Sequence, residues 1–170
     1  RYTTSHPLDM DLELIKAHKN VDKLMPYLHL PIQSGSDNIL KKMNRRHTAS
    51  EYLKIIELVR KYCEDIAISS DFIVGHPGET NEDHKKTLDI INEVQFASSY
   101  SFMYSERPGT KSSEFGEIID KNIKKIRLHQ IQNKLNHYQL AFNKNMEGLE
   151  LPILITDKNK NNQLLGRSPY

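Results

Sequence analysis

The stretch Ile68-Ser-Ser-Asp71-Phe-Ile-Val-Gly75-His-Pro-Gly78-Glu-Thr80 decides the fold class of this chain. Its first half is rich in apolar and β-branched residues, which is typical of a strand that is covered on both faces. Two glycines and a proline follow directly, and Thr80 then begins a helix-capping pattern. A strand that passes through a tight turn into a helix is the building unit of parallel α/β proteins. We therefore predict a strand over Ile66 to Gly75 within a parallel sheet.

Three further stretches repeat this pattern of a strand-like segment followed by a polar turn. They are Tyr2-Thr-Thr-Ser-His6-Pro7, Leu28-His-Leu-Pro31-Ile-Gln33-Ser-Gly35-Ser36 and Tyr100-Ser-Phe-Met-Tyr104-Ser-Glu-Arg107-Pro-Gly109-Thr110. The carboxyl ends of parallel strands meet at one edge of a sheet, and α/β proteins bind their ligands there. The four turns therefore predict one ligand pocket.

Helical patterns lie between these strands. We expect a helix from Asp9 to Met25, ended by Pro26, and a short helix capped by Ser36 or Asp37. Capping-box patterns begin at Thr48 and at Thr80, and predict helices that run to about 62 and through 94. Four such β-then-α units imply right-handed crossovers in a sheet that is open or curled into part of a barrel.

The chain changes character after Lys121. Apolar residues spaced by three to five positions predict one long helix to Glu147, which Gly148 ends. Its polar face is basic, with Lys121, Lys124, Lys125, Arg127, Lys134 and Lys144. This face is either simply solvated or contacts phosphates. Leu151 to Ile155 and the polar residues after it predict the first strand and hairpin of a β-rich module, so we expect domains over 1–148 and 149–170.

Composition limits the classes of function. The chain has 24 Lys and Arg against 22 Asp and Glu, so contact with nucleic acid requires local clustering of charge. The single cysteine, Cys63, excludes an internal disulfide and cannot by itself hold a metal cluster. No apolar run or signal peptide points to a membrane, so we expect a cytoplasmic protein. The start at Arg1 and the end at Tyr170 suggest a segment of a longer protein.

Three polar side chains are candidates for ligand binding. Asp71, inside a strand, must be hydrogen-bonded or charge-paired, either within the protein or to a ligand. Gln33 offers a donor and an acceptor suited to sugar hydroxyls, and Arg45 offers a guanidinium that grips a carboxylate. The turn from Gly75 to Gly78 is expected to approach a ligand with its N–H groups free.

Other chemistries find little support. The chain has no Gly-x-Ser-x-Gly elbow, no Gly-x-Gly-x-x-Gly fingerprint and no P-loop. Ser34, Ser69 and Ser70 have no obvious paired base, and His76 has no neighbour at the spacing of metal ligands. We therefore predict no catalytic and no metal-ligating residue in this chain.

Four motifs together resemble the methylthiotransferase branch of the radical S-adenosylmethionine enzymes. They are His29-Leu-Pro-Ile-Gln-Ser-Gly-Ser36, Met43-Asn-Arg-Arg-His-Thr48, Ser70-Asp-Phe-Ile-Val-Gly75 with Pro77-Gly-Glu-Thr80, and Tyr104-Ser-Glu-Arg-Pro-Gly-Thr110. The resemblance is greatest to the MiaB type, which converts isopentenyladenosine beside the tRNA anticodon into its 2-methylthio form. It implies the later half of an incomplete (β/α)6 barrel up to about residue 148, followed by the start of a small β-barrel TRAM domain.

The resemblance also implies a cofactor and partners. S-adenosylmethionine would lie with its ribose toward Gln33, its methionine carboxylate toward Arg45 and Asp71 at the wall, with Ser34 and Gly75 completing the site. Its 5′-deoxyadenosyl radical would abstract hydrogen from the adenine carbon to which a methylated sulfur is then added. The family holds 4Fe-4S clusters through a Cys-x3-Cys-x2-Cys loop and an amino-terminal domain, and Cys63 matches neither. The implied partners are tRNA and the missing amino-terminal part of the same enzyme.

Three hypotheses about function follow. The first is a carboxyl-terminal fragment of such a tRNA methylthiotransferase, inactive alone. The second is a ribosomal-protein methylthiotransferase or another radical enzyme of similar barrel, such as an oxygen-independent coproporphyrinogen oxidase. The third is a non-catalytic tRNA-binding remnant of a split gene. His76 departs from the aromatic residue that the family often has there.

Overall fold

The structure is a computed structural model that describes residues 2, 6–106, 109, 116 and 119–170. Most of the strand predicted over Tyr2 to His6 lies outside the described residues, as do Arg107, Pro108 and Thr110 of the turn after Tyr104. Among the described residues, no helix is both long enough and apolar enough to cross a membrane.

In the part of the chain that the structure describes, a three-stranded parallel sheet forms the centre of the fold. Its strands are β1 (Tyr27–His29), β2 (Ala67–Val74) and β3 (Ser98–Met103), in the spatial order β1-β2-β3. The register pairs Leu28 with Ile68, and Asp71 with Tyr100. The parallel α/β architecture predicted from the β-branched stretch is therefore confirmed.

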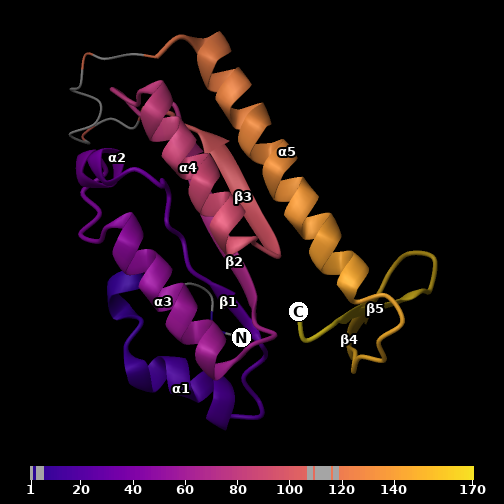
Figure 1. Ribbon diagram of the computed structural model, residues 1–170. Helices are drawn as coiled ribbons and strands as arrows, with labels where there is room; N and C mark the ends of the chain where they lie inside the picture. The colour runs from indigo at the N-terminus through magenta and orange to yellow at the C-terminus, as the bar shows by residue number, and fades with distance from the viewer. Residues whose placement is uncertain (1, 3–5, 107–108, 110–115, 117–118) are drawn as a thin grey trace.

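Four helices lie along the chain between and beside these strands (Figure 1). They are α1 (Leu12–Asn20), α2 (Asp37–Lys42), α3 (Ala49–Tyr62) and α4 (Asn81–Val94). Both predicted capping boxes are present: Thr48 and Glu51 begin α3, and Thr80 and Asp83 begin α4. In each box the threonine hydroxyl accepts from the backbone N–H of the third helical residue. The acidic side chain of that residue accepts in turn from the backbone N–H of the threonine, so two otherwise free donors are satisfied.

Two predicted elements have different bounds in the structure. The helix expected from Asp9 to Met25 is a short 3-10 turn, η1 (Pro7–Asp9), followed by α1, because Asp11 caps a new helix at Leu14 N–H. The helix then ends at Asn20, well before Pro26. The strand expected through Gln33 ends at His29, since Pro31 has no N–H to donate and Gln33 keeps only an isolated bridge to Phe72.

One face of the sheet packs against α3 and α4 to form the core. Phe72 meets Phe96 edge to face, with ring centroids 5.3 Å apart. The buried Tyr52 of α3 donates its hydroxyl to the carbonyl of Leu30 (2.9 Å) and so ties the helix to the chain just after β1. These contacts fix the helical layer against the strands (Figure 1).

The other face of the sheet carries the strand residues that alternate with the buried core residues. Asp71 and Ile73 of β2 are partly exposed, and their register partners Tyr100 and Phe102 of β3 are 64% and 54% exposed. Successive side chains of a strand point to opposite faces, so these four residues share one face. We call this the open face of the sheet.

The long helix α5 (Lys121–Asn145) runs beside β3 (Figure 1); it begins at the predicted residue and ends slightly before the predicted Glu147. Its buried residues are Arg127, Ile131 and Leu135, and Gly148 follows it with a positive φ of 82°. The predicted hairpin is also present, as the antiparallel pair β4 (Leu154–Lys158) and β5 (Leu164–Arg167), which begins later than Leu151.

Candidate functional site

Gln33 and Asp71 lie side by side where the chain after β1 meets β2. The N–H of Gln33 donates to the carbonyl of Asp71 (2.9 Å), and the N–H of Ile73 donates to the carbonyl of Gln33 (2.9 Å). Gln33 has a positive φ of 75° and is 9% exposed. A non-glycine residue in this left-handed region is strained, and such strain is concentrated at functional sites.

The side chain of Asp71 has charged and polar neighbours, as predicted for a carboxylate within a strand. The Nε2 atom of His29 lies 3.5 Å from its Oδ2 atom, and the Nδ1 atom of His29 lies 3.0 Å from the hydroxyl of Ser69. Burial lowers the pKa of Arg45, and the nearby carboxylate of Asp71 acts in the opposite direction. The structure thus brings Gln33, Arg45 and Asp71 together.

Ser34 faces a different neighbour. Its buried hydroxyl lies 3.3 Å from that of Thr87 on α4 and accepts from the N–H of Ser36 (3.2 Å). The next residue, Gly35, packs so closely on α4 that an added β-carbon would lie 2.4 Å from the carbonyl oxygen of Lys86. The Ser34 hydroxyl therefore attaches the loop to α4 and is not among the side chains gathered around Asp71.

The Gly75–Gly78 turn is closed by its own hydrogen bonds. Both glycines have positive φ, 71° and 74°. The N–H of Gly75 donates to Oε2 of Glu79 (3.0 Å), and the N–H of Glu79 donates to the carbonyl of His76 (2.9 Å). The expectation that the N–H groups of this turn are free is therefore wrong at Gly75, because the Glu79 carboxylate lies within the turn and accepts there.

His76 is part of the turn's packing. Its ring is 2% exposed, meets the ring of Tyr104 at 5.0 Å between centroids, and has Nδ1 3.1 Å from the carbonyl oxygen of Pro77. Burial lowers the pKa of His76. The amine of Lys124 lies 5.5 Å above the centre of the Tyr104 ring, within the range of a cation–π contact.

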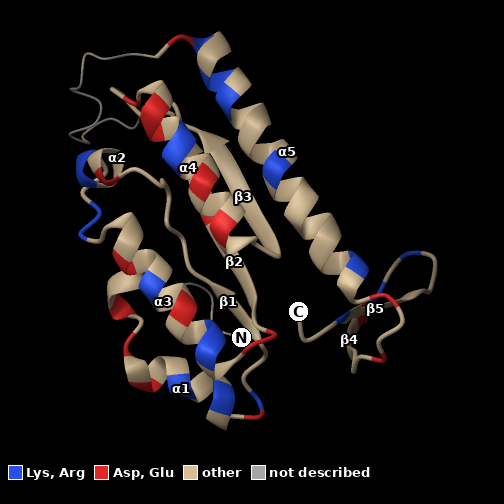
Figure 2. Ribbon diagram, viewed as in Figure 1, with Lys and Arg blue, Asp and Glu red and all other residues tan. Residues whose placement is uncertain are grey.

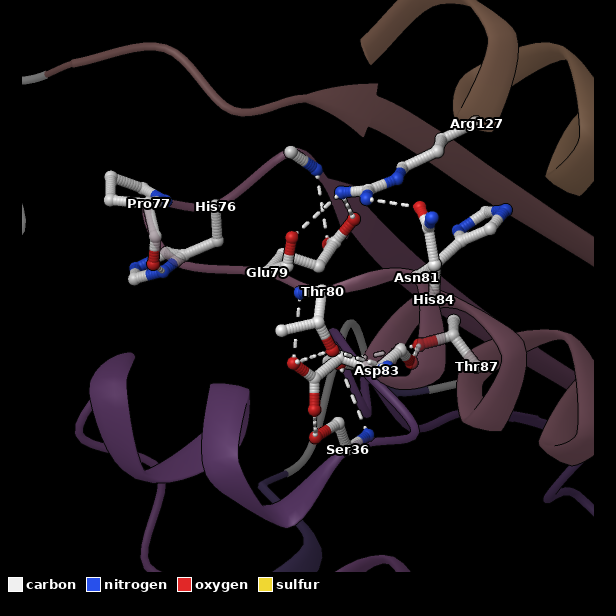
Figure 3. A network of polar contacts seen from close by, with 12 residues as sticks. Ser36, His76, Pro77, Glu79, Thr80, Asn81, Asp83, His84, Thr87 and Arg127 are labelled. Atoms are coloured by element: carbon white, nitrogen blue, oxygen red, sulfur yellow. Dashed lines mark hydrogen bonds and ion pairs between the residues drawn. The ribbon is translucent and has the colours of Figure 1, made fainter. Parts of the chain in front are cut away.

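Arg127 of α5 joins this turn to the long helix (Figure 3). Its Nη1 atom donates to Oε1 of Glu79 (2.7 Å) and to the carbonyl of Glu79 (3.0 Å), and its Nη2 atom donates to Oδ1 of Asn81 (2.8 Å). The helical pattern predicted Arg127 on the polar face of the helix, and that prediction is wrong. The buried carboxylate of Glu79 draws the guanidinium into the interior.

A second carboxylate connects α2 with α4. Oδ1 of Asp83 accepts from the hydroxyl of Ser36 at 2.5 Å, and its Oδ2 accepts from the N–H and the hydroxyl of Thr80 (Figure 3). Burial alone raises the pKa of Asp83, but the hydrogen bonds from Ser36 and Thr80 outweigh it and lower that pKa. The loop after β1 is therefore tied to the start of α4, which follows the turn after β2.

A metal cluster does not fit the residues present. Among the residues that the structure describes, no three His, Cys, Asp or Glu side chains gather at metal-binding distances. The one cysteine, Cys63, ends α3, and burial raises the pKa of its thiol, which disfavours the thiolate that binds iron.

Comparison with known proteins identifies the family. The model of the radical SAM superfamily matches residues 1–91, more than half of the chain. This chain belongs to the radical SAM superfamily. An archaeal Elp3 from Methanocaldococcus infernus, with residues 1–46 deleted, has the same fold: its TM-score is 0.58 at 19% identity, over 80% of this chain and 31% of that one.

This radical SAM chain also has relatives of high identity. It is 54% identical to the tRNA-2-methylthio-N(6)-dimethylallyladenosine synthase of Ehrlichia chaffeensis, over 100% of this chain and 39% of that protein. The protein of the same name from Ehrlichia ruminantium strain Welgevonden is 53% identical over 99% and 38%. The chain therefore spans less than half of the length of these relatives.

Sequence reasoning overlooked several residues of this site in the radical SAM chain. His29, which contacts Asp71, could have been found from period-two alternation, since 29, 31 and 33 share one parity and the apolar residues between them, Leu30 and Ile32, are buried. The same rule applied from Asp71 and Ile73 leads to Tyr100 and Phe102 only once the register of β2 and β3 is known. Nothing in the sequence pairs Glu79 with Arg127, which lies 48 positions later.

Proposed function

We propose that this chain is the carboxyl-terminal part of a tRNA methylthiotransferase, which adds a methylthio group to isopentenyladenosine beside the anticodon. The identity of 52–54% with enzymes named for this reaction supports the proposal. The chain matches only 38–39% of the length of those relatives, which also supports the proposal. The cysteines that hold the iron–sulfur clusters would then belong to the part of the enzyme outside this match. The whole enzyme acts on tRNA in the cytoplasm, and this chain alone is inactive.

S-adenosylmethionine is held at the carboxyl edge of the sheet. Arg45, half-buried beside Asp71, pairs with the methionine carboxylate, and Gln33 hydrogen-bonds the ribose. Asp71 forms the wall that His29 supports, and Gly75 lets the backbone turn next to the ligand. Ser34 contributes through its place in the loop, since its hydroxyl contacts α4. When bound, the cofactor supplies the radical chemistry of the superfamily.

The proposal extends to the finer fold, which the open face of the sheet supports. We propose that residues 1–148 form the later half of an incomplete (β/α)6 barrel, whose interior the open face lines. The exposure of Tyr100 and Phe102 supports this, because large aromatic side chains are seldom left bare on a finished sheet. Residues 149–170 form the start of a TRAM domain, which the exposed hairpin of β4 and β5 supports.

The helix α5 faces the tRNA. It contains no Asp or Glu, and Figure 2 shows Lys and Arg spaced along its length. Arg127 is buried against Glu79, and Lys134 donates to Oδ1 of Asn92 (2.6 Å). The exposed cations are Lys121, Lys125 and Lys144, and these are available to phosphates.

The convergence of Gln33, Arg45 and Asp71 on one sheet edge carries this proposal. The test uses the full-length enzyme, reconstituted with iron and sulfide and supplied with reductant and S-adenosylmethionine. Undermodified tRNA and ribosomal proteins are offered in parallel, and both are analysed by mass spectrometry. We expect 2-methylthio-isopentenyladenosine in the tRNA. A methylthio group on a ribosomal protein alone, or S-adenosylmethionine cleavage by residues 1–170 without the remaining part, would contradict the proposal.

A further inference from the structure

Arg127 occupies a position of α5 where the helix pattern calls for an apolar residue. It lies one turn before Ile131 and two turns before Leu135, on the same helical face, and all three are buried. Ile131 and Leu135 belong to the hydrophobic core. The guanidinium of Arg127 instead donates to three acceptors, which lie on Glu79, in the turn between β2 and α4, and on Asn81, the first residue of α4.

The carboxylate of Glu79 connects two parts of the fold (Figure 3). One oxygen accepts from Arg127 (2.7 Å), and the other accepts from the N–H of Gly75 (3.0 Å), the first residue after β2. Burial acts to raise the pKa of Glu79, whereas Arg127 and the Gly75 N–H oppose this change. Through this one carboxylate, the end of β2 is linked to α5.

The helix also approaches the turn closely. An added β-carbon on Gly75 would lie 2.5 Å from Cγ of Lys124, and Gly75 has a φ of 71°, a conformation that favours glycine. A small shift of α5 along its axis would therefore press Lys124 against the turn or open a gap beside it. The relative position of the helix and the turn has a direct effect on the backbone that follows Asp71 and Ile73 on β2.

A buried ion pair contributes little to stability compared with apolar side chains that fill the same volume. The ion pair instead fixes the position of α5 relative to the turn, because the guanidinium of Arg127 can reach its three acceptors together in one arrangement only. An apolar residue at 127 would make no directional contact with Glu79 or Asn81. The presence of Arg127 at this buried position therefore indicates that the relative position of α5 and the turn matters more here than the free energy of apolar packing.

We infer that Glu79 and Arg127 are positioning residues for the S-adenosylmethionine site, because they hold the turn at Gly75 in register with α5. The inference rests on the proposed function, which places S-adenosylmethionine beside this turn. Neither side chain touches the ligand in this proposal, since both are buried and hydrogen-bond to each other, to Gly75 and to Asn81.

The experiment replaces both members of the pair with apolar side chains of similar length. The variant Glu79→Met with Arg127→Met, made in the full-length reconstituted enzyme, leaves no unpaired buried charge, so its melting temperature is expected to stay near that of the wild type. We expect its dissociation constant for S-adenosylmethionine to rise by about tenfold or more, because a loosened turn no longer presents its site in one geometry. The absorbance of the reconstituted cluster is expected to stay unchanged, since this chain holds no cluster ligands.

The matched control is Asn92→Ala. Asn92 of α4 also links to α5, through Lys134 (2.6 Å) and Tyr138 (3.1 Å), but this link lies farther along the helix from the turn. We expect its dissociation constant for S-adenosylmethionine to equal that of the wild type. An equal loss of affinity in the control and the double variant would contradict a specific role for Glu79 and Arg127.

A conservative variant covers the case in which the double variant does not fold. Arg127→Lys keeps the charge but loses the fork, so affinity for S-adenosylmethionine falls while the folded protein is retained. Wild-type affinity in either folded variant would overturn the inference and leave the proposed function intact. Failure of the wild-type enzyme to bind S-adenosylmethionine would overturn both.

Discussion

The Nε2 atom of His29 lies 3.5 Å from the Oδ2 atom of Asp71, across the β1–β2 pair on the open face of the sheet. Arg45 approaches the same carboxylate from the segment after α2. Asp71 is thus surrounded by groups that can stabilise its charge, and it is still partly exposed toward the open face. Such an arrangement fits the role that we propose for Asp71 in the wall of an S-adenosylmethionine site.

The first prediction concerns this carboxylate. Asp71→Asn in the full-length enzyme is expected to weaken S-adenosylmethionine binding by about tenfold, or ~1.4 kcal/mol, because it removes a charge from the wall of the site. Anaerobic equilibrium dialysis measures this change. The control Asp65→Asn removes the same charge just before β2, at the opposite end of the strand, and should leave the affinity unchanged. Equal affinities for wild type and Asp71→Asn would remove Asp71 from the site.

The second prediction tests a capping box. Thr48 accepts from the N–H of Glu51 (3.2 Å), and the Glu51 carboxylate accepts from the N–H of Thr48 (2.7 Å). Thr48→Ala is expected to destabilise the first turn of α3 by about 1 kcal/mol. Hydrogen–deuterium exchange of the amides of residues 49–53 should accelerate by roughly fivefold as a result. The exposed Ser50→Ala should leave the exchange rates near those of the wild type, and unchanged rates in Thr48→Ala would contradict the role of the cap.

These caps show what the sequence could predict. A capping box lies within four consecutive residues, so the starts of α3 and α4 could be read directly from Thr48 and Thr80. The parallel strands could be predicted because their β-branched residues and following turns are also local. The bounds of β1 could not, because the chain leaves the ladder at Pro31 and Gln33 adopts a strained φ that depends on its contact with Phe72.

The residues of the candidate site also include some that could be predicted from the sequence and some that could not. Gln33, Arg45 and Asp71 were predicted from their side-chain chemistry and from motif positions, and the structure brings them together. The burial of Arg127 could not be predicted, because its partner Glu79 is distant in sequence and an arginine among lysines is usually solvated. The Gly75 N–H was wrongly expected to be free for the same reason, since its acceptor is that buried carboxylate.

The third prediction concerns pH. His47 is 4% exposed and packs against His6, and burial lowers its pKa from 6.5 to about 4. Between these values the unfolded chain binds a proton that the folded chain does not, so the free energy of unfolding falls as the pH is lowered from 6.5 toward 4. The slope from His47 reaches about 1.4 kcal/mol per pH unit.

Urea unfolding at a series of pH values checks this slope. Burial also lowers the pKa of His18, His76 and His84, so the wild-type slope includes their contributions. His47→Phe should reduce the slope of the unfolding free energy against pH by up to the contribution of one proton, about 1.4 kcal/mol per pH unit. The control His129→Gln, at an exposed position, should leave the slope unchanged. A slope that is the same in His47→Phe and in the wild type would show that His47 is not buried in its neutral form.

The fourth prediction concerns the exposed lysines of α5. Lys121→Glu with Lys125→Glu in the full-length enzyme should weaken tRNA binding and reduce the dependence of log Kd on log salt by about 0.7 for each phosphate that is no longer neutralised. Filter binding at several salt concentrations measures both quantities. Lys19→Glu with Lys23→Glu makes the same change of charge near α1 and should have little effect. Equal effects of the two double variants on tRNA affinity would show a general effect of net charge.

Arg45, Gln33 and Asp71 form half of the proposed S-adenosylmethionine site. The most direct test is the dissociation constant of S-adenosylmethionine for the full-length enzyme as wild type, Arg45→Met and Arg46→Met. Arg45 is half-buried beside Asp71, whereas its neighbour Arg46 is exposed, so the two variants remove equal charge one residue apart. We expect affinity for S-adenosylmethionine to fall by about tenfold or more in Arg45→Met and to equal that of the wild type in Arg46→Met. Wild-type affinity in a folded Arg45→Met variant would exclude Arg45 from the site.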